Sequence, residues 1–329
     1  MDKTIAFMIG DPAGIGPEIT VKCLRDYKID ENVRILLVGD KKSFDRALSI
    51  TGSELNVEVV DEDRIDGAAG RYLFLDVPAG TEEIPFGSVS PVAGACVYES
   101  LKKIMKLIDE KKVGGFVFAP FNKEAMKLGG CPYSSELEMF KDHFHRQDVN
   151  GEINYLAPIW TNRVTSHIAV KDIASYIVKD RVMASILFLD EEMKRFGLKN
   201  PRIAVAALNP HGGEKGLFGT EEIEHIAPAV EQAASRGVDV SGPFPADTIF
   251  LRVRKGEFDG VLSMYHDQGQ VATKLLGFDS GVTIHGGMPV AIATCAHGTA
   301  FDIAGTGKAS ANALTEALKV VLTSLEKED

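Results

Sequence analysis

Three histidines stand where an α/β protein places functional side chains. His211 follows the apolar run Arg202–Ala207, and His266 follows another such run, Gly260–Met264. Polar residues directly after buried strands are typical of ligand sites at the carboxyl ends of parallel strands. His167 lies in an apolar stretch, where a hydrogen-bonded core histidine is an equally good interpretation. Three neutral imidazoles suit a divalent transition ion with an open position for substrate, while a capping role is the alternative for His211.

Two glycine-rich segments are candidates for cofactor binding. Gly10–Glu18 lies between a predicted strand and a predicted helix, but its spacing is not that of the dinucleotide fingerprint. It is therefore either a ligand loop or an ordinary strand–turn–helix connection. His297–Lys308 is dense in small residues, which let backbone amides approach a phosphate or adenosine group. A surface turn ahead of the last helix is the alternative. The candidates in this segment are His297, Gly298, Thr299, Asp302, Gly305 and Gly307.

Strand-like and helix-like segments alternate along the chain. Short apolar runs predict buried strands at Thr4–Ile9, Val33–Val38, Tyr72–Leu75, Gly115–Ala119, Arg202–Ala207 and Gly260–Met264. Longer amphipathic segments predict helices at Pro17–Tyr27, Val92–Glu110, Asp180–Phe196, Thr220–Ser235 and Ser310–Glu326. This alternation predicts a parallel, doubly wound α/β architecture. Composition does not mark where one lobe ends and the next begins.

Composition excludes several classes of protein. The 329 residues are 45% hydrophobic and 25% charged, which is typical of a globular chain with a large core divided into two lobes. A net charge of −11 argues against a nucleic-acid partner. No N-terminal signal and no apolar run long enough to span a membrane are visible. The four cysteines are scattered without a CxxC pair, so we expect buried thiols in a reduced, cytoplasmic protein.

Taken together, these motifs make the chain similar to the 4-hydroxythreonine-4-phosphate dehydrogenase family of vitamin B6 synthesis. The resemblance runs from Gly10 to Lys308 and includes Ala119–Ala125, Lys215–Glu222, Gly242–Thr248 and Lys274–Gly277. It implies a two-lobed αβα fold like that of isocitrate and isopropylmalate dehydrogenases, with the active site in the cleft between the lobes. We expect one lobe, with the NAD segment, to contain residues 1–125 and 280–329, and the other, with the metal ligands and dimer contacts, to contain residues 126–279.

The resemblance also implies a homodimer and a set of site residues. His167, His211 and His266 would hold the metal, with ligands contributed across the dimer interface. His297–Gly307 would carry NAD, and Lys274 would bind the substrate.

Several positions depart from the family pattern at the substrate end. A usual Gly-His-Thr-Glu stretch is Ser-Glu-Leu-Glu here, so Glu136 and Leu137 replace a histidine and a threonine. The other replacements are Thr283 for an asparagine, Ile292 for an arginine of the phosphate site, and Ala296 for an aspartate. Losing an arginine and a histidine while gaining a glutamate disfavours a phosphate group. His285, in a stretch that resembles that of cis-dihydrodiol-oxidising relatives, is either a replacement polar contact or a structural residue.

The activity that the resemblance implies is NAD-dependent oxidation of a 4-hydroxythreonine-4-phosphate-like hydroxy acid, with decarboxylation and a divalent metal (Zn, Mg, Mn or Co) as Lewis acid. Lys123, Asp247 and Asp267 are unranked candidates for proton transfer. One alternative is a dehydrogenase of a non-phosphorylated substrate such as a cis-dihydrodiol carboxylate or a sugar acid. Another is a non-catalytic metabolite-binding relative. An acyltransferase-like relative would not need three histidines. We expect no nucleic-acid or membrane partner.

Overall fold

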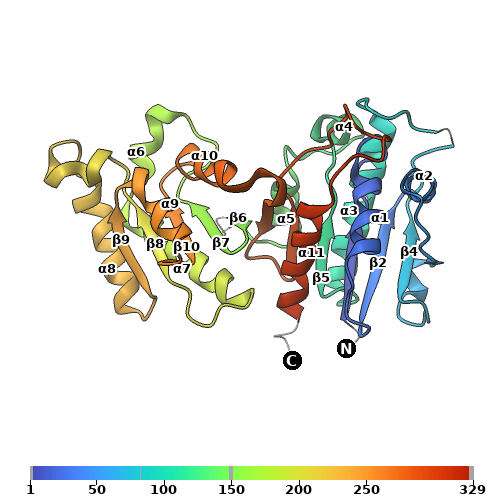
Figure 1. The fold of residues 1–329 in the computed structure, drawn as a ribbon, viewed down its shortest axis with the longest axis horizontal. Helices are drawn as coiled ribbons and strands as arrows, with labels where there is room; N and C mark the ends of the chain where they lie inside the picture. Colours follow the sequence, from blue (N-terminus) through green and yellow to red (C-terminus); the bar gives the residue numbers. More distant parts are fainter. Residues whose placement is uncertain (1–2, 82, 148–150, 326–329) are drawn as a thin grey trace. The chain divides into compact units, whose positions relative to one another are not determined.

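The protein has a mixed α/β fold that divides into two compact units (Figure 1). A computed structural model describes residues 3–81, 83–147 and 151–325. Unit 1 consists of Met1–Gln147 with Val282–Asp329, and unit 2 consists of Asp148–Gly281. The structure divides the chain after Gln147 and after Gly281, whereas the predicted lobe boundaries are at residues 125 and 279. The segment with the NAD candidates lies in unit 1, and the three candidate metal ligands lie in unit 2.

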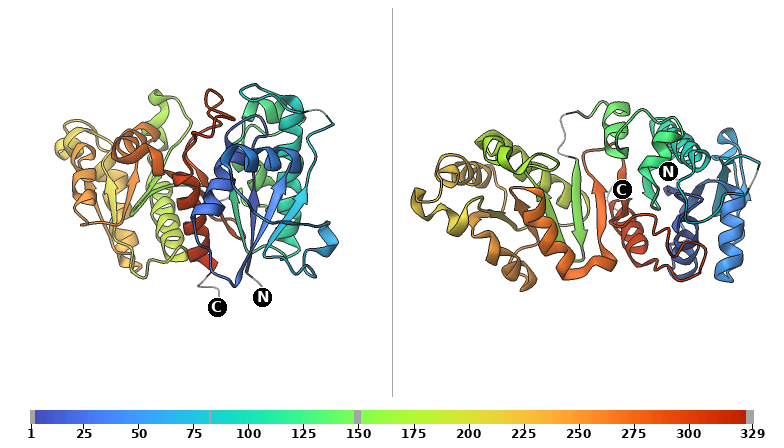
Figure 2. Two further views of the ribbon diagram at one scale, coloured as in Figure 1. Left: turned by 45° about the vertical axis from the view of Figure 1, so that its right-hand side comes forward. Right: turned by 90° about the horizontal axis from the view of Figure 1, so that it is seen from above.

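The strands of unit 1 lie in the order β3-β4-β2-β1-β5-β12-β11. All the pairs are parallel except β11 with β12, which is antiparallel. Helices lie on both faces: Figure 2 shows α1, α2 and α11 on one side of the strands and α3 and α4 on the other. The bounds are β1 (Lys3–Met8), α1 (Gly16–Asp26), β2 (Val33–Gly39), α2 (Lys41–Thr51), β3 (Glu58–Val59), β4 (Tyr72–Asp76), α3 (Pro91–Asp109), β5 (Gly115–Phe118), α4 (Lys123–Leu128), α5 (Glu136–His143), β11 (Val282–His285), β12 (Ala291–Cys295) and α11 (Asn312–Leu325).

Local sequence accounts for the elements of unit 1. Strands β1 and β2 are nearly continuous apolar runs because helices cover both faces of a parallel sheet. Asp40 begins α2 by accepting a hydrogen bond from the Ser43 N–H, and Ser90 caps α3 in the same way. A proline in the first turn of α1 and of α3 suits the helix start, because those N–H groups have no partner inside the helix.

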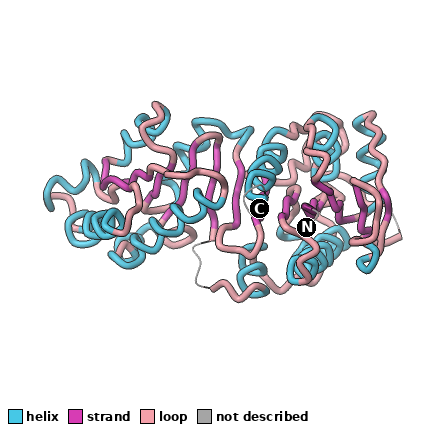
Figure 3. Tube along the Cα trace, turned by 90° about the horizontal axis from the view of Figure 1, so that it is seen from below, coloured by secondary structure: helices cyan, strands magenta, loops and turns pink. Residues whose placement is uncertain are grey.

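The strands of unit 2 lie in the order β6-β7-β10-β8-β9, with β6 and β7 antiparallel and the other pairs parallel. Helix α7 packs against β7, β10 and α8, and α8 packs against β9. Helix α9 packs against β8 and β10, and α10 packs against β7 and β10. Figure 3 shows helices on both sides of the strands in each unit. The bounds are β6 (Glu152–Leu156), β7 (Ile159–Arg163), α6 (Ile173–Tyr176), α7 (Lys179–Arg195), β8 (Ile203–Ala206), α8 (Ala227–Ser235), β9 (Val240–Phe244), α9 (Ala246–Arg254), β10 (Gly260–Ser263) and α10 (His266–Gly277).

Every strand and helix that the apolar patterns predict is present, with small differences at the ends. The patterns miss β3, β6, β7, β9, β11 and β12, because these strands are short and most carry polar residues that break the apolar run. They also miss the two antiparallel pairs. The helix predicted over Thr220–Ser235 is a π-helical turn, Glu222–Ile226, followed by α8. The last predicted helix is described as far as Leu325, and Glu326 lies outside the described residues.

None of the described helices has the length and apolar character needed to cross a membrane. All four cysteines are free and buried, as expected. Burial raises the pKa of the Cys23 thiol to about 11 and that of the Cys96 and Cys295 thiols to about 12.

We expect the four thiols to be unreactive in the folded protein, because each is buried and a neutral thiol is a poor nucleophile. Labelling with Ellman's reagent at pH 8 should modify less than about one thiol per chain in buffer and all four in guanidinium chloride. Rapid labelling of the native protein would contradict the packing described for Cys23, Cys96 and Cys295.

Candidate functional site

Two of the three candidate metal ligands lie side by side in unit 2. Strands β7 and β10 are parallel neighbours, with Arg163 opposite Ser263 at their carboxyl ends. The chain continues from β7 to His167, and α10 begins at His266 directly after β10. The two exits are joined because the Thr165 hydroxyl and N–H both donate to the Met264 carbonyl. The rings of His167 and His266 are 5.7 Å apart between centroids.

The surroundings of this pair fit a metal-binding role. His167 is exposed, so it is not a core histidine. His266 Nδ1 lies 2.7 Å from Asp267 Oδ1, and such a carboxylate fixes the ring and leaves Nε2 for a ligand. Neutral imidazoles with a carboxylate behind one of them are the donor set that a divalent transition ion prefers.

His211 is not part of this group. Within residues 3–81, 83–147 and 151–325, no three His, Cys, Asp or Glu side chains are arranged to hold one metal ion. His211 is exposed on a turn that follows β8. The other candidates of unit 2 are also exposed: Asp247 in the first turn of α9, and Lys274 on α10, the helix that begins with His266.

The candidate NAD segment of unit 1 lies against the glycine loop that follows β1. The Ile15 N–H donates to the Thr299 carbonyl at 3.1 Å, and a Cβ added to Gly14 would lie 3.0 Å from Thr299 Cβ. A Cβ at Gly10 would lie 2.6 Å from the Pro120 carbonyl oxygen. The glycines of this loop therefore serve close approach between chain segments, which favours the structural interpretation of Gly10–Glu18.

A buried carboxylate holds the end of the candidate NAD segment. Glu18, on α1, is 3% exposed and accepts hydrogen bonds from the N–H groups of Gly307 and Ala309. Lys22 forms an ion pair with Glu18 at 2.8 Å and donates to the carbonyls of the same two residues. The segment His297–Gly307 is thus an ordered turn-rich segment with its backbone anchored on α1.

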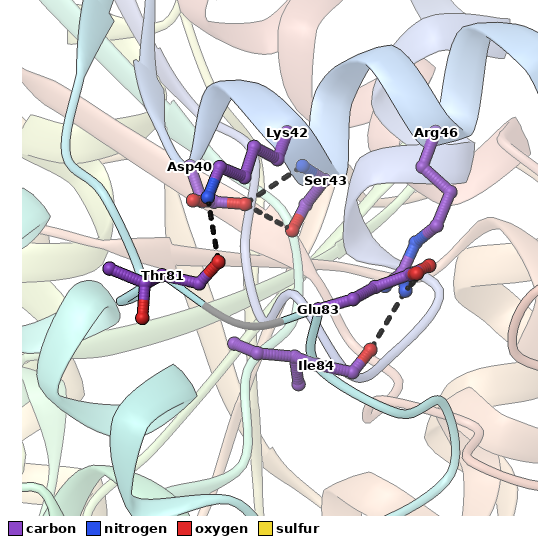
Figure 4. A pocket seen from close by; sticks show the side chains of 7 residues that line it. All are labelled: Asp40, Lys42, Ser43, Arg46, Thr81, Glu83 and Ile84. Carbon is purple, nitrogen blue, oxygen red and sulfur yellow. Dashed lines mark hydrogen bonds and ion pairs between the residues drawn. The ribbon is translucent and has the colours of Figure 1, made fainter.

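A pocket of about 290 Å³ lies at the amino end of α2 (Figure 4). It contains two cations, but both are already bound to the backbone. Lys42 Nζ donates to the Thr81 carbonyl at 3.1 Å, and Arg46 donates to the carbonyls of Ile84 and Pro12 at 2.8 and 2.9 Å. Because these donors are occupied, we do not assign the pocket to an anionic substrate group.

Glu136 and Lys123 form an ion pair in unit 1. Glu136 is the first residue of α5, and its side chain is 10% exposed. Its Oε2 lies 3.0 Å from Lys123 Nζ, at the start of α4, and has no other polar partner among the described residues. Leu137 is half-buried beside it. A proton-transfer candidate, Lys123, and a substrate-end candidate, Glu136, are therefore brought together from different elements.

The remaining substrate candidates lie on β11 and β12. Ile292 is fully buried in β12, between β5 and β11, so the position where the resemblance implies an arginine supplies no charge. Thr283, on β11, is opposite Thr294. His285 is 1% exposed, with its ring stacked 5.6 Å from that of Phe118.

Sequence reasoning missed the buried acids that hold these segments. Besides Glu18, Asp11 is 1% exposed and accepts hydrogen bonds from the Ala13 and Asn122 N–H groups, and burial raises the pKa of its carboxyl. Glu222 has the same function behind the His211 turn. The sequence does contain one signal for these acids, since each lies within or just after a glycine-containing motif. That signal is weak, because an exposed acidic residue could occupy the same position without any fixed partner.

Replacing Glu18 by alanine should destabilise the protein by about 3 kcal/mol, because it leaves Lys22 and two backbone N–H groups without their buried partner. Urea unfolding measures this effect. Glu316→Ala is the matched control, since its pair with Lys319 is more exposed and should contribute less than about 1 kcal/mol. Equal losses in the two variants would contradict the anchoring role of Glu18.

Comparison with known proteins decides the family. The family model described as "Pyridoxal phosphate biosynthetic protein PdxA" matches residues 31–321. The chain belongs to the PdxA family. It is 41% identical to the Pseudomonas aeruginosa protein named "Putative 4-hydroxythreonine-4-phosphate dehydrogenase 2", with 96% of this chain and 95% of that protein covered. It is 37% identical to a protein of Oceanobacillus iheyensis named "Putative D-threonate 4-phosphate dehydrogenase", with 95% of each covered.

Solved structures agree with this membership of the PdxA family. The 4-hydroxythreonine-4-phosphate dehydrogenase of Klebsiella pneumoniae has a TM-score of 0.84 at 34% identity, with 98% of each chain covered. A terephthalate 1,2-cis-dihydrodiol dehydrogenase of Burkholderia xenovorans has a TM-score of 0.69 at 25% identity, again with 98% of each covered. A β-decarboxylating dehydrogenase of Thermococcus kodakarensis, at 15% identity and a TM-score of 0.53, shares the fold, with 97% of this chain and 81% of that one covered. The predicted fold class is confirmed.

Proposed function

We propose that this protein is an NAD-dependent dehydrogenase that oxidises a small hydroxy acid with the help of a divalent metal ion. The observation that carries the proposal is the pair His167–His266 at the ends of adjacent strands, with Asp267 behind it, in a chain whose relatives are named dehydrogenases. When bound, the ion would act as a Lewis acid toward the substrate oxygen.

The chain's own residues divide the remaining work. His297–Gly307 would bind NAD through its backbone, and Lys274 would neutralise an anionic group of the substrate. Because Asp267 is engaged with His266, we assign it to orienting that ring and leave proton transfer to Lys123 or Asp247. When bound, NAD would accept the hydride from the substrate carbon, and the base would take the hydroxyl proton. A carboxylate β to the new carbonyl would then leave as CO₂, and the enolate that keeps the electron pair of the broken bond would take a proton.

A phosphorylated hydroxy acid is the first candidate substrate, in line with the names of the relatives from Pseudomonas aeruginosa and Oceanobacillus iheyensis. The ion pair of Lys123 with Glu136, together with the buried Ile292, favours a second candidate, a non-phosphorylated diol or sugar acid. Both observations reduce the positive charge available to a phosphate. The Burkholderia xenovorans relative is named for a dihydrodiol.

We further propose that the enzyme is a homodimer in which a second copy completes the metal site. The two imidazoles of one chain leave a third ligand to be supplied, and His211 is exposed. Most of the exposed large apolar side chains among the described residues lie in unit 2, several close in sequence to site residues. Leu275, beside Lys274, is 83% exposed, and Leu217, on the segment after His211, is 74% exposed.

The activity is tested by following NAD reduction with a panel of phosphorylated and non-phosphorylated hydroxy acids, with Mg, Mn, Zn or Co added. We expect turnover that chelation abolishes and the metal restores. A protein that binds these acids without reducing NAD under any of these conditions would be a metabolite-binding relative instead.

Glu136→Gln should raise kcat/KM for a phosphorylated substrate relative to its non-phosphorylated analogue by about tenfold, because it removes a negative charge that repels the phosphate. Glu138→Gln is the matched control on the same helix, since Glu138 is exposed and hydrogen-bonded to Ser134. An unchanged ratio in both variants would exclude Glu136 as a determinant of substrate choice.

A further inference from the structure

The turn that carries His211 has an unusual backbone. His211, Gly212, Gly213, Glu214 and Lys215 have φ values of 54°, 68°, 77°, 45° and 54°. Five consecutive residues in the left-handed region, three of them with a Cβ, form a conformation that an isolated chain avoids. Such a segment persists only where the surrounding structure imposes it.

Burial of the turn does not supply this constraint. Of the residues from Pro210 to Thr220, only Gly213 is buried, and Phe218 is 50% exposed. The constraint must come from groups that hold the ends and the inside of the turn.

Glu222 is placed to do this. It is 3% exposed, and its Oε1 accepts hydrogen bonds from the Leu208 and Asn209 N–H groups at 2.8 and 2.7 Å. Its Oε2 accepts from the Asn209 side chain at 2.9 Å, and a Cβ added to Gly213 would lie 2.7 Å from the same oxygen. One carboxylate therefore fixes the two residues that enter the turn and fills the space beneath it.

Glu222 also begins a segment of irregular helix. Glu222 is the first residue of the π-helical turn that precedes α8, and such turns frequently occur at functional sites. Glu221 contacts Asn209 as well, whereas Glu224, two residues further, is exposed.

We propose that Glu222 is a positioning residue, whose buried carboxylate locks the left-handed turn and thereby presents the His211 imidazole for metal binding. A buried carboxylate beneath an exposed segment contributes little to hydrophobic packing. Its effect is to fix the positions of the side chains on that segment. The inference rests on the proposed function for the role of His211.

The test compares Glu222→Gln with the matched control Glu224→Gln. Amide hydrogen exchange without metal should be accelerated at least about tenfold over residues 208–218 in Glu222→Gln alone. Co²⁺ affinity should fall about 10- to 100-fold in the same variant, as for other residues that orient a metal ligand. Unchanged exchange with a Co²⁺ affinity within about twofold of the control would overturn the proposal.

Two further variants separate the possible failures. If Glu222→Gln does not fold, Asn209→Ala removes the side-chain contacts with Glu221 and Glu222 and keeps the backbone bonds to Glu222. It should accelerate exchange in the turn without affecting the rest of unit 2, and no local effect would overturn the proposal. If His211→Ala retains full Co²⁺ affinity, the proposed role of His211 fails, while the exchange measurement still decides whether Glu222 orders the turn.

Discussion

Buried carboxylates that accept backbone N–H groups from other segments hold the functional loops of this protein. A carboxylate with little water around it costs free energy unless it is hydrogen-bonded, and two N–H groups from a loop meet that need while fixing the loop. The acids that do this are Asp11, Glu18, Asp40 and Glu222. Each is close in sequence to the end of a strand or the start of a helix, so the rigid elements determine where the loops lie.

The buried acids differ in the groups that they contact. Glu136 is also buried, yet it accepts no N–H group among the described residues and faces the ammonium group of Lys123 instead. This difference supports the proposed role of Glu136 in substrate recognition rather than in holding a loop. By contrast, Glu18 supports the end of the segment proposed to bind NAD, and Glu222 supports the turn that carries His211.

The sequence allowed the fold class, the positions of most long elements and the strand exits of His211 and His266 to be predicted, because these depend on apolar periodicity and on local glycine patterns. It did not allow the pairing of His167 with His266 to be distinguished from a threefold group with His211, since that depends on which strands are neighbours. The left-handed turn could not be predicted from its own residues either. Two glycines permit this conformation, but the contacts that hold it come from Glu222, about a dozen residues further along the chain. The glycines of the loop after β1 were ambiguous for the same reason, because their neighbours come from distant segments.

The proposed function requires His167 and His266 to bind one divalent metal ion together. Titration of the metal-free protein with Co²⁺, followed by visible absorbance, measures this binding in the wild type and in His167→Ala and His266→Ala. We expect one Co²⁺ per chain in the wild type and an affinity lower by more than about 100-fold in each variant, with the folded structure retained. Co²⁺ binding of wild-type strength and spectrum in both variants would contradict it.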